Sequence, residues 1–86
     1  MQLDDMQIFV ATVDARNFTS AANRLSLSKQ FVSRRVMTLE DALGVRLLIR
    51  NTRKLAVTEL GQEFYDRAKR ILGEVEEAEQ DRKSVV

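Results

Sequence analysis

The chain has no cysteine, no histidine, no proline and no tryptophan among its 86 residues. The first two absences exclude disulfide bonds, the common zinc sites, and the Ser-His-Asp and Cys-His forms of nucleophilic catalysis. The lack of cysteine is compatible with a reducing cytoplasm. Few aromatic residues and no proline favour helical structure. We expect neither a metal nor a cofactor.

A long apolar segment is also missing. No stretch of about 18 apolar residues occurs, so we expect nothing in this sequence to span a membrane. Residues 1–10 carry two acids and no basic segment, which is unlike a secretion signal. A chain of 86 residues forms one small domain with a thin core, which often needs support from a partner. We therefore expect a small cytoplasmic domain.

The formal net charge of +1 hides an uneven distribution. Residues 1–23 carry a net charge of −2 and residues 55–86 a net charge of −3. Residues 24–54 carry a net charge of +6, from eight basic and two acidic side chains. This middle segment, the basic block, lies between two acidic segments. For a polyanion such as DNA, the local field matters more than the total charge.

Apolar residues recur at helical spacing through the first half of the sequence. Residues 3–15 form an amphipathic pattern, and Thr19 is a good N-cap for a second helix that ends near Leu25. Ser28 can cap a third helix, and Gly44 can end it. The apolar stripe of this third helix is its expected core face and comprises Val32, Val36, Leu39 and Leu43. Two helices joined by a short turn predict a helix-turn-helix, which places its second helix in the DNA major groove.

Residues 47–58 indicate a β-hairpin. The β-prone residues 47–50 and 55–58 flank the polar residues 51–54. An isolated hairpin is only marginally stable in water, so this one must pack on the helices. A hairpin with a basic tip, placed after a helix-turn-helix, is typical of a wing.

The last third of the sequence predicts one long helix that Thr58 caps. Gly61 and Gly73 are each expected to weaken it by roughly 1 kcal/mol relative to alanine. A seam at heptad spacing comprises Phe64, Ala68, Ile71, Val75 and Ala78. The seam predicts a homodimer interface. Alternatively, these side chains pack back on the helices of their own chain, which Phe64 can do even in a dimer.

The predicted fold is mainly α. Residues 1–58 form a winged helix-turn-helix with a three-helix core and a hairpin wing, and residues 59–86 form a linker and dimerisation helix. The candidate DNA-binding residues lie on the polar face of the third helix and on the wing. They are Ser28, Lys29, Gln30, Ser33, Arg34, Arg50, Thr52 and Arg53. Glutamine can pair with adenine, and arginine or lysine with guanine, while wing arginines can enter the minor groove or bind phosphates.

An ordered set of motifs covers about residues 1–80. It comprises LxxMxxFVATV, FTSAANRL, SLSKQFVSRRVMTLEDALGVRLL and RNTRKLAVTELG, followed by the long helix. In this order the motifs resemble the N-terminal DNA-binding domain of LysR-type transcriptional regulators of bacteria. The resemblance implies a linker helix that pairs antiparallel with a second copy, and an interrupted palindrome in a promoter as the DNA site. It also implies that a small-molecule effector binds only a separate C-terminal domain, which this sequence does not contain.

The resemblance has departures at the reading end of the third helix. Lys29 stands where the family usually has glutamine or proline, and Phe31 stands where a small residue is usual. Leu48 replaces a commoner phenylalanine. The preferred bases can therefore differ from those of relatives. Phe31 can contact a thymine methyl group or fill the gap between helices, and we expect the second.

Two other kinds of function stay open. A non-specific architectural DNA binder needs basic residues but no polar reading face, so Gln30, Ser33 and Arg34 argue against it. A winged helix can also be a protein-interaction module with no role at nucleic acids. The carboxylates of Glu59 and Glu63 lie on a solvated helix, so we expect no enzyme activity.

Overall fold

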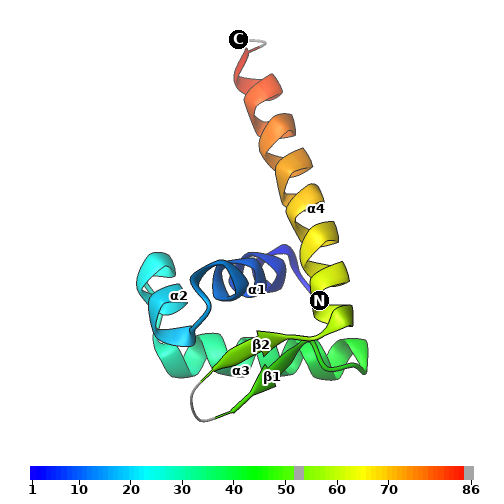
Figure 1. Cartoon of the computed structure of the whole chain (residues 1–86). Helices are drawn as coiled ribbons and strands as arrows, with labels where there is room; N and C mark the ends of the chain where they lie inside the picture. The colour runs from blue at the N-terminus through cyan, green and yellow to red at the C-terminus, as the bar shows by residue number, and fades with distance from the viewer. Residues whose placement is uncertain (52–53, 85–86) are drawn as a thin grey trace.

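The computed structural model describes residues 1–51 and 54–84. They form helices α1 (Leu3–Ala15), α2 (Phe18–Leu25) and α3 (Lys29–Leu43), strands β1 (Leu48–Arg50) and β2 (Leu55–Val57), and helix α4 (Glu59–Ser84). The first three helices and the hairpin form one body, which α4 leaves as a long rod (Figure 1). The mainly α winged helix-turn-helix predicted from the sequence is confirmed. None of the described helices is long and apolar enough to cross a membrane.

Helices α1, α2 and α3 enclose the hydrophobic core. Phe9 of α1 and Val32 and Leu39 of α3 are buried there. Ala21 and Ala22 of α2 are buried as well, and their small side chains let α2 lie close to its neighbours. The core therefore holds α3 by one face, and the opposite face of α3 is exposed to solvent.

Local hydrogen bonds determine where α2 begins and ends. The side chain of Asn17 accepts a hydrogen bond of 2.7 Å from the backbone N–H of Ser20. Asn17 is therefore the N-cap, and the prediction of Thr19 is wrong, because Thr19 already lies in the first turn of the helix. Ser26 ends α2 in the left-handed conformation with φ 57°, which turns the chain sharply toward α3.

The ends of α3 were predicted correctly. The hydroxyl of Ser28 accepts a hydrogen bond of 3.1 Å from the backbone N–H of Phe31. Gly44 has φ 71°, a left-handed conformation that costs glycine little. The predicted core stripe is confirmed for Val32, Val36 and Leu39. Leu43, at the last position of the helix, is instead 37% exposed.

The hairpin is antiparallel and packs on the helices with one face. Leu48 pairs with Val57, and Arg50 pairs with Leu55. The side chain of Leu48 is buried in the core, whereas that of Ile49 is 51% exposed, as the alternation of a strand requires. The two strands of the predicted wing are therefore packed on the helical body through Leu48.

Helix α4 starts at a tight junction with the residues before β1. The hydroxyl of Thr58 accepts a hydrogen bond of 2.9 Å from the N–H of Gly61, as a predicted cap should. The N–H of Thr58 donates to the carbonyl of Leu47 at 3.0 Å. A Cβ atom at Gly61 would lie 2.1 Å from that carbonyl oxygen. The predicted cost in helix propensity therefore comes with a packing requirement that the sequence does not reveal, because the missing side chain of Gly61 admits the Leu47 carbonyl.

The first turns of α4 pack on α1. The ring of Phe64 meets that of Phe9 edge to face, with 5.4 Å between the ring centres, and Ala68 is fully buried. The hydroxyl of Tyr65 donates to the carboxylate of Asp14, and this bond raises the pKa of Tyr65. The rest of α4 projects from the body, which gives the molecule a longest dimension of 50 Å (Figure 1).

Candidate nucleic-acid interface

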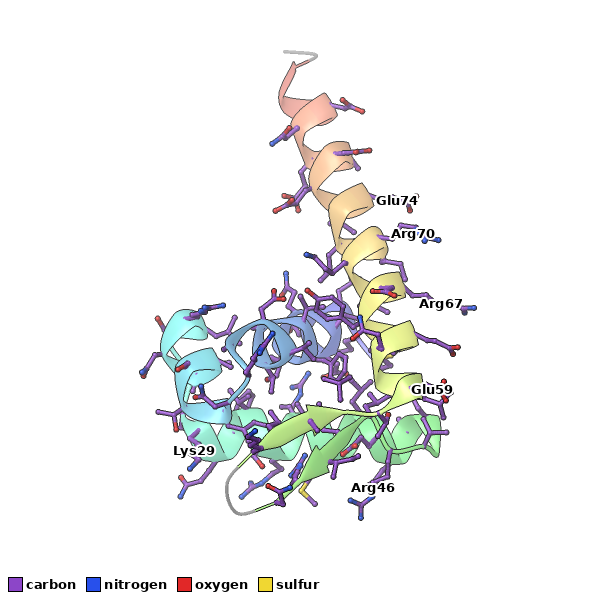
Figure 2. The ribbon with its side chains drawn as sticks, viewed as in Figure 1. Lys29, Arg46, Glu59, Arg67, Arg70 and Glu74 are labelled. Carbon is purple, nitrogen blue, oxygen red and sulfur yellow. The ribbon has the colours of Figure 1, made fainter. Side chains whose placement is uncertain are left out.

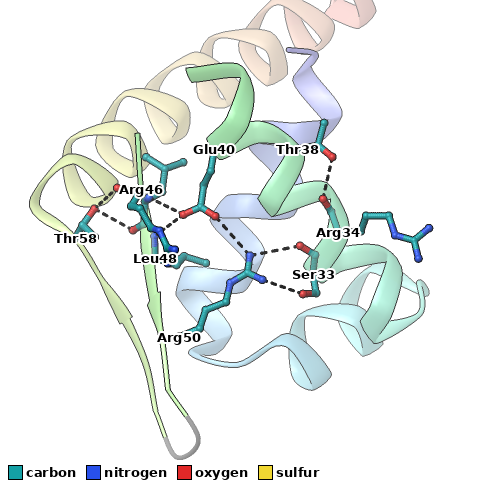
Figure 3. Close-up of polar contacts among 9 residues, drawn as sticks. Ser33, Arg34, Thr38, Glu40, Arg46, Leu48, Arg50 and Thr58 are labelled. Atoms are coloured by element: carbon teal, nitrogen blue, oxygen red, sulfur yellow. Dashed lines mark hydrogen bonds and ion pairs between the residues drawn. The ribbon is translucent and has the colours of Figure 1, made fainter. Parts of the chain in front are cut away.

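Helix α3 carries polar side chains on the side away from the core. Lys29, Gln30 and Arg34 are exposed, and Lys29 lies at the N-terminal end of α3 (Figure 2). The side chain of Arg34 points away from the polar contacts that surround its neighbours (Figure 3). Ser28 is exposed at the start of the helix. Because recognition helices read bases with their N-terminal residues, we call these four residues the reading face.

Two further candidates, Ser33 and Arg50, contact each other. Nη1 of Arg50 donates to the hydroxyl oxygen of Ser33 at 3.2 Å, and Nη2 donates to the Ser33 carbonyl at 3.5 Å (Figure 3). The guanidinium also lies 3.6 Å from the carboxylate of Glu40 and 5.0 Å from the ring centre of Phe18. The sequence predicts Arg50 at the wing tip, facing DNA. The structure places its guanidinium between β1, α2 and α3 instead, where several partners satisfy its charge and its donors.

Glu40 has a positioning role that sequence reasoning missed. Its Oε2 accepts the backbone N–H groups of Leu47 at 2.8 Å and of Leu48 at 3.1 Å. Its Oε1 forms the ion pair with Arg50, so one carboxylate attaches β1 to α3 (Figure 3). The sequence feature that could have indicated this role is that Glu40 is one of only two acidic residues in the basic block, where an acid is expected to pair with a neighbouring cation.

The wing tip is described only in part. The candidates Thr52 and Arg53 lie outside the described residues. Lys54 is exposed, and its backbone N–H donates to the side-chain oxygen of Asn51 at 2.8 Å. The turn therefore keeps a basic side chain at the solvent side of the hairpin.

Phe31 lies beside the reading face. Its side chain is 42% exposed, so the expectation that it fills a gap between helices is wrong. The guanidinium of Arg35 lies 5.7 Å from the centre of its ring, and Arg35 donates to the carboxylate of Asp5. Burial opposes ionisation of Asp5, but hydrogen bonds from the Gln2 backbone and Arg35, with the Arg35 charge, hold its pKa below the ordinary value. Phe31 is thus held by a fixed cation rather than by the core.

The basic block contributes exposed cations from α2, α3 and the hairpin region. Two of its arginines are paired within the chain, Arg35 with Asp5 and Arg50 with Glu40. The exposed basic residues of the block, within the described residues, are Arg24, Lys29, Arg34, Arg46 and Lys54. Lys29 and Lys54 line one hollow between α3 and the hairpin, and with Arg34 of α3 they give this part of the domain a field that attracts phosphates.

The predicted α4 seam divides into two parts. Phe64 and Ala68 pack within their own chain, so Ala68, which is fully buried, has no surface to offer a second copy. Further along α4, Ile71 is 37% exposed, Val75 is half-buried and Ala78 is exposed. A heptad pattern marks an apolar helix face whichever helix covers it, which is why the sequence did not separate the two parts.

The fold and the exposed face of α3 define a class of protein. A helix-turn-helix with a polar and basic second helix, followed by a hairpin wing, is a winged helix-turn-helix DNA-binding domain. The family model described as "Bacterial regulatory helix-turn-helix protein, lysR family" matches residues 3–62. The chain belongs to this family and is a LysR-type DNA-binding domain of transcriptional regulators.

Known relatives agree with this membership. An HTH-type transcriptional regulator of Xanthomonas campestris pv. campestris is 48% identical over 77 residues, which are 90% of this chain and 22% of that protein. The crystal structure of the BenM DNA-binding domain with catB site 1 DNA matches with a TM-score of 0.95 and 34% identity, over 99% of this chain and 94% of that one. The CbnR DNA-binding domain in complex with DNA matches with a TM-score of 0.92 and 32% identity, over 99% and 98% of the two chains. This chain spans about a quarter of the length of the curated relatives it matches.

Proposed function

We propose that this domain recognises a specific DNA sequence as a dimer, with α3 in the major groove and the wing at the minor groove or the backbone. The observation that carries the proposal is the reading face, where polar and basic side chains stand exposed at the N-terminal end of α3. The complexes of BenM and CbnR domains with DNA support it, because both match 99% of this chain. The proposed site is an interrupted palindrome in a bacterial promoter, since a two-fold axis relates the two reading faces.

Each side chain of the reading face has a defined capacity for base contacts. The amide of Gln30 offers both a donor and an acceptor, which match adenine N7 and N6. Arg34 and Lys29 can donate to guanine N7 and O6. Ser28 and Lys54, with Thr52 and Arg53 of the wing, are proposed to contact the sugar-phosphate backbone or the adjacent minor groove.

The outer part of α4 is proposed to hold the dimer together. Ile71, Val75 and Ala78 form an apolar strip on the part of α4 that projects from the body. A second copy that packs antiparallel on this strip would bury it and present two domains to one DNA site. Control by a small-molecule effector, as the family resemblance implies, is proposed to reside outside the residues of this sequence.

Selection of bound sequences from a random duplex pool tests the specific function directly. We expect an enriched palindrome, whose affinity falls steeply with salt because phosphate contacts release counterions. The selected duplex should then compete for the domain much better than a scrambled duplex of the same composition. Equal competition would contradict sequence-specific binding and favour the architectural alternative. No retardation of any duplex at low salt would favour the protein-interaction alternative.

A further inference from the structure

The contacts of Arg50 fix the hydrogen-bonding state of Ser33. The guanidinium is held on one side by the carboxylate of Glu40 and on another by the ring of Phe18. Glu40 is itself fixed by two backbone N–H groups at the start of β1. From this fixed position Arg50 donates to the hydroxyl oxygen of Ser33 at 3.2 Å (Figure 3). The side chain of Arg50 is only 27% exposed.

This contact favours donation over acceptance by the Ser33 hydroxyl. A serine hydroxyl has one donor hydrogen and two acceptor lone pairs. Arg50 occupies one lone pair, and a hydrogen bond from a cation polarises the hydroxyl, which makes it a stronger donor and a weaker acceptor. No hydrogen bond donated by the Ser33 hydroxyl occurs in the part of the chain that the structure describes. The hydroxyl hydrogen is thus available to an acceptor next to the reading face.

We propose that Arg50 is a positioning residue that fixes Ser33 as a hydrogen-bond donor to DNA and thereby sets a base preference. The inference rests on the proposed function, because it needs α3 in the major groove. There, guanine presents two acceptors, N7 and O6, whereas cytosine presents an amino donor. Ser33 therefore favours guanine over cytosine at the base position it faces.

The same geometry assigns Arg50 an indirect role at DNA. Its side chain bridges the last residue of β1 to α3, so it holds the wing at a set distance from the reading face. A guanidinium that turned out to a phosphate would leave the carboxylate of Glu40 without its ion pair. Arg50 thus acts on base choice through Ser33.

The test compares base preferences rather than overall affinity. Sequences are selected from a random duplex pool with the parent domain and with Ser33→Ala, Arg50→Met and the double variant. The parent should prefer guanine over cytosine at one position of each half-site by about three- to tenfold, the worth of one hydrogen bond. Ser33→Ala and Arg50→Met should each flatten this same position, and the double variant should flatten it no further.

Two further variants separate positioning from general damage. Arg46→Met removes the same charge from an exposed neighbour of β1, and it should leave the preference at every position unchanged. Arg50→Lys keeps the charge and serves as a second variant where Arg50→Met does not fold. Its compact ammonium lacks the planar fork with which Arg50 contacts both Ser33 and Glu40, so it should flatten the position partly.

The outcomes distinguish this inference from the proposed function. If no sequence is enriched by the parent domain, the proposed function fails. If a site is enriched but Ser33→Ala leaves all preferences intact, Ser33 contacts phosphate and the inference is overturned. It is also overturned if Arg50→Met lowers affinity evenly while the guanine preference persists.

Discussion

The two glycines of α4 allow one substitution to be tested in two environments. Replacing Gly61 with alanine would put a Cβ atom 2.1 Å from the Leu47 carbonyl oxygen and 2.8 Å from Cγ1 of Val57. That oxygen also accepts the N–H of Thr58, so it cannot move without loss of a hydrogen bond. Replacing Gly73 would put a Cβ atom into open space, with no atom within 4 Å other than those of the surrounding helix backbone.

The expected effects have opposite signs. Overpacking against a fixed backbone costs up to about 3 kcal/mol, and the better helix propensity of alanine returns about 1 kcal/mol. Gly61→Ala should therefore lower the free energy of unfolding by about 2 kcal/mol, which lowers the midpoint of thermal unfolding by about 8–16 °C in a domain of this size. Gly73→Ala should gain about 1 kcal/mol and raise the midpoint by about 4–8 °C.

Thermal unfolding followed by circular dichroism measures both variants. The protomer concentration must be the same in every sample, because the proposed dimer would make the midpoint depend on concentration. Since the chemical change is identical and both sites lie in α4, a difference in sign reports the packing at the junction. If both substitutions raise the midpoint alike, helix propensity alone governs α4, and the close contact between Gly61 and Leu47 is refuted.

Four other perturbations test the interface and the fold. Arg34→Ala should cost roughly 1–3 kcal/mol of binding free energy and relax the preference at one base position. The matched control Arg70→Ala, on α4, should leave both unchanged, and an equal loss of affinity for all sequences would make Arg34 a phosphate contact. Ile71→Glu should yield a monomer in sedimentation and weaken palindrome binding much more than half-site binding, and a persisting dimer would show that the interface lies elsewhere. The pKa of Asp5 is lowered in the folded state, so its ion pair with Arg35 stabilises the domain at pH values above the unfolded pKa of Asp5, and this stabilisation is lost as the pH falls through the folded pKa. Asp5→Asn should remove this pH-dependent contribution, so the free energy of unfolding should vary less with pH below about pH 4. Replacing site thymines one at a time with deoxyuridine reports on Phe31: a loss of affinity that Phe31→Ala abolishes indicates a contact with a thymine methyl group, and no such loss at any position excludes one.

Signals that act within a few residues were readable from the sequence. The sequence correctly predicts Ser28, Gly44 and Thr58 as helix ends, because a cap depends on its own backbone and on residues at most four positions away. The cap of α2 was assigned wrongly, since Asn17 and Thr19 are both suitable residues two positions apart. The order of helices and hairpin followed from such local signals combined with hydrophobic spacing.

Features that depend on contacts between distant residues were not readable in the same way. Propensity alone makes Gly61 a weak point, whereas the structure shows that it is the place where a carbonyl from residue 47 must fit. Composition alone makes Arg50 a DNA ligand, because its partners Glu40 and Ser33 are ten and seventeen residues away. Likewise, the heptad pattern of α4 could not show that Ala68 is covered by its own chain.

The junction at Thr58 has a mechanical consequence for the proposed dimer. Helix α4 has 26 residues and is therefore about 39 Å long. Thr58 and Gly61 attach its base to Leu47 so closely that the helix and the hairpin must rotate together. A tilt of about 10° at this base would shift the far end by about 7 Å over that length. Half-sites one turn of DNA apart are separated by about 34 Å. In the proposed dimer, a small change of angle around the Leu47 carbonyl would therefore change how far apart the two reading faces stand on DNA.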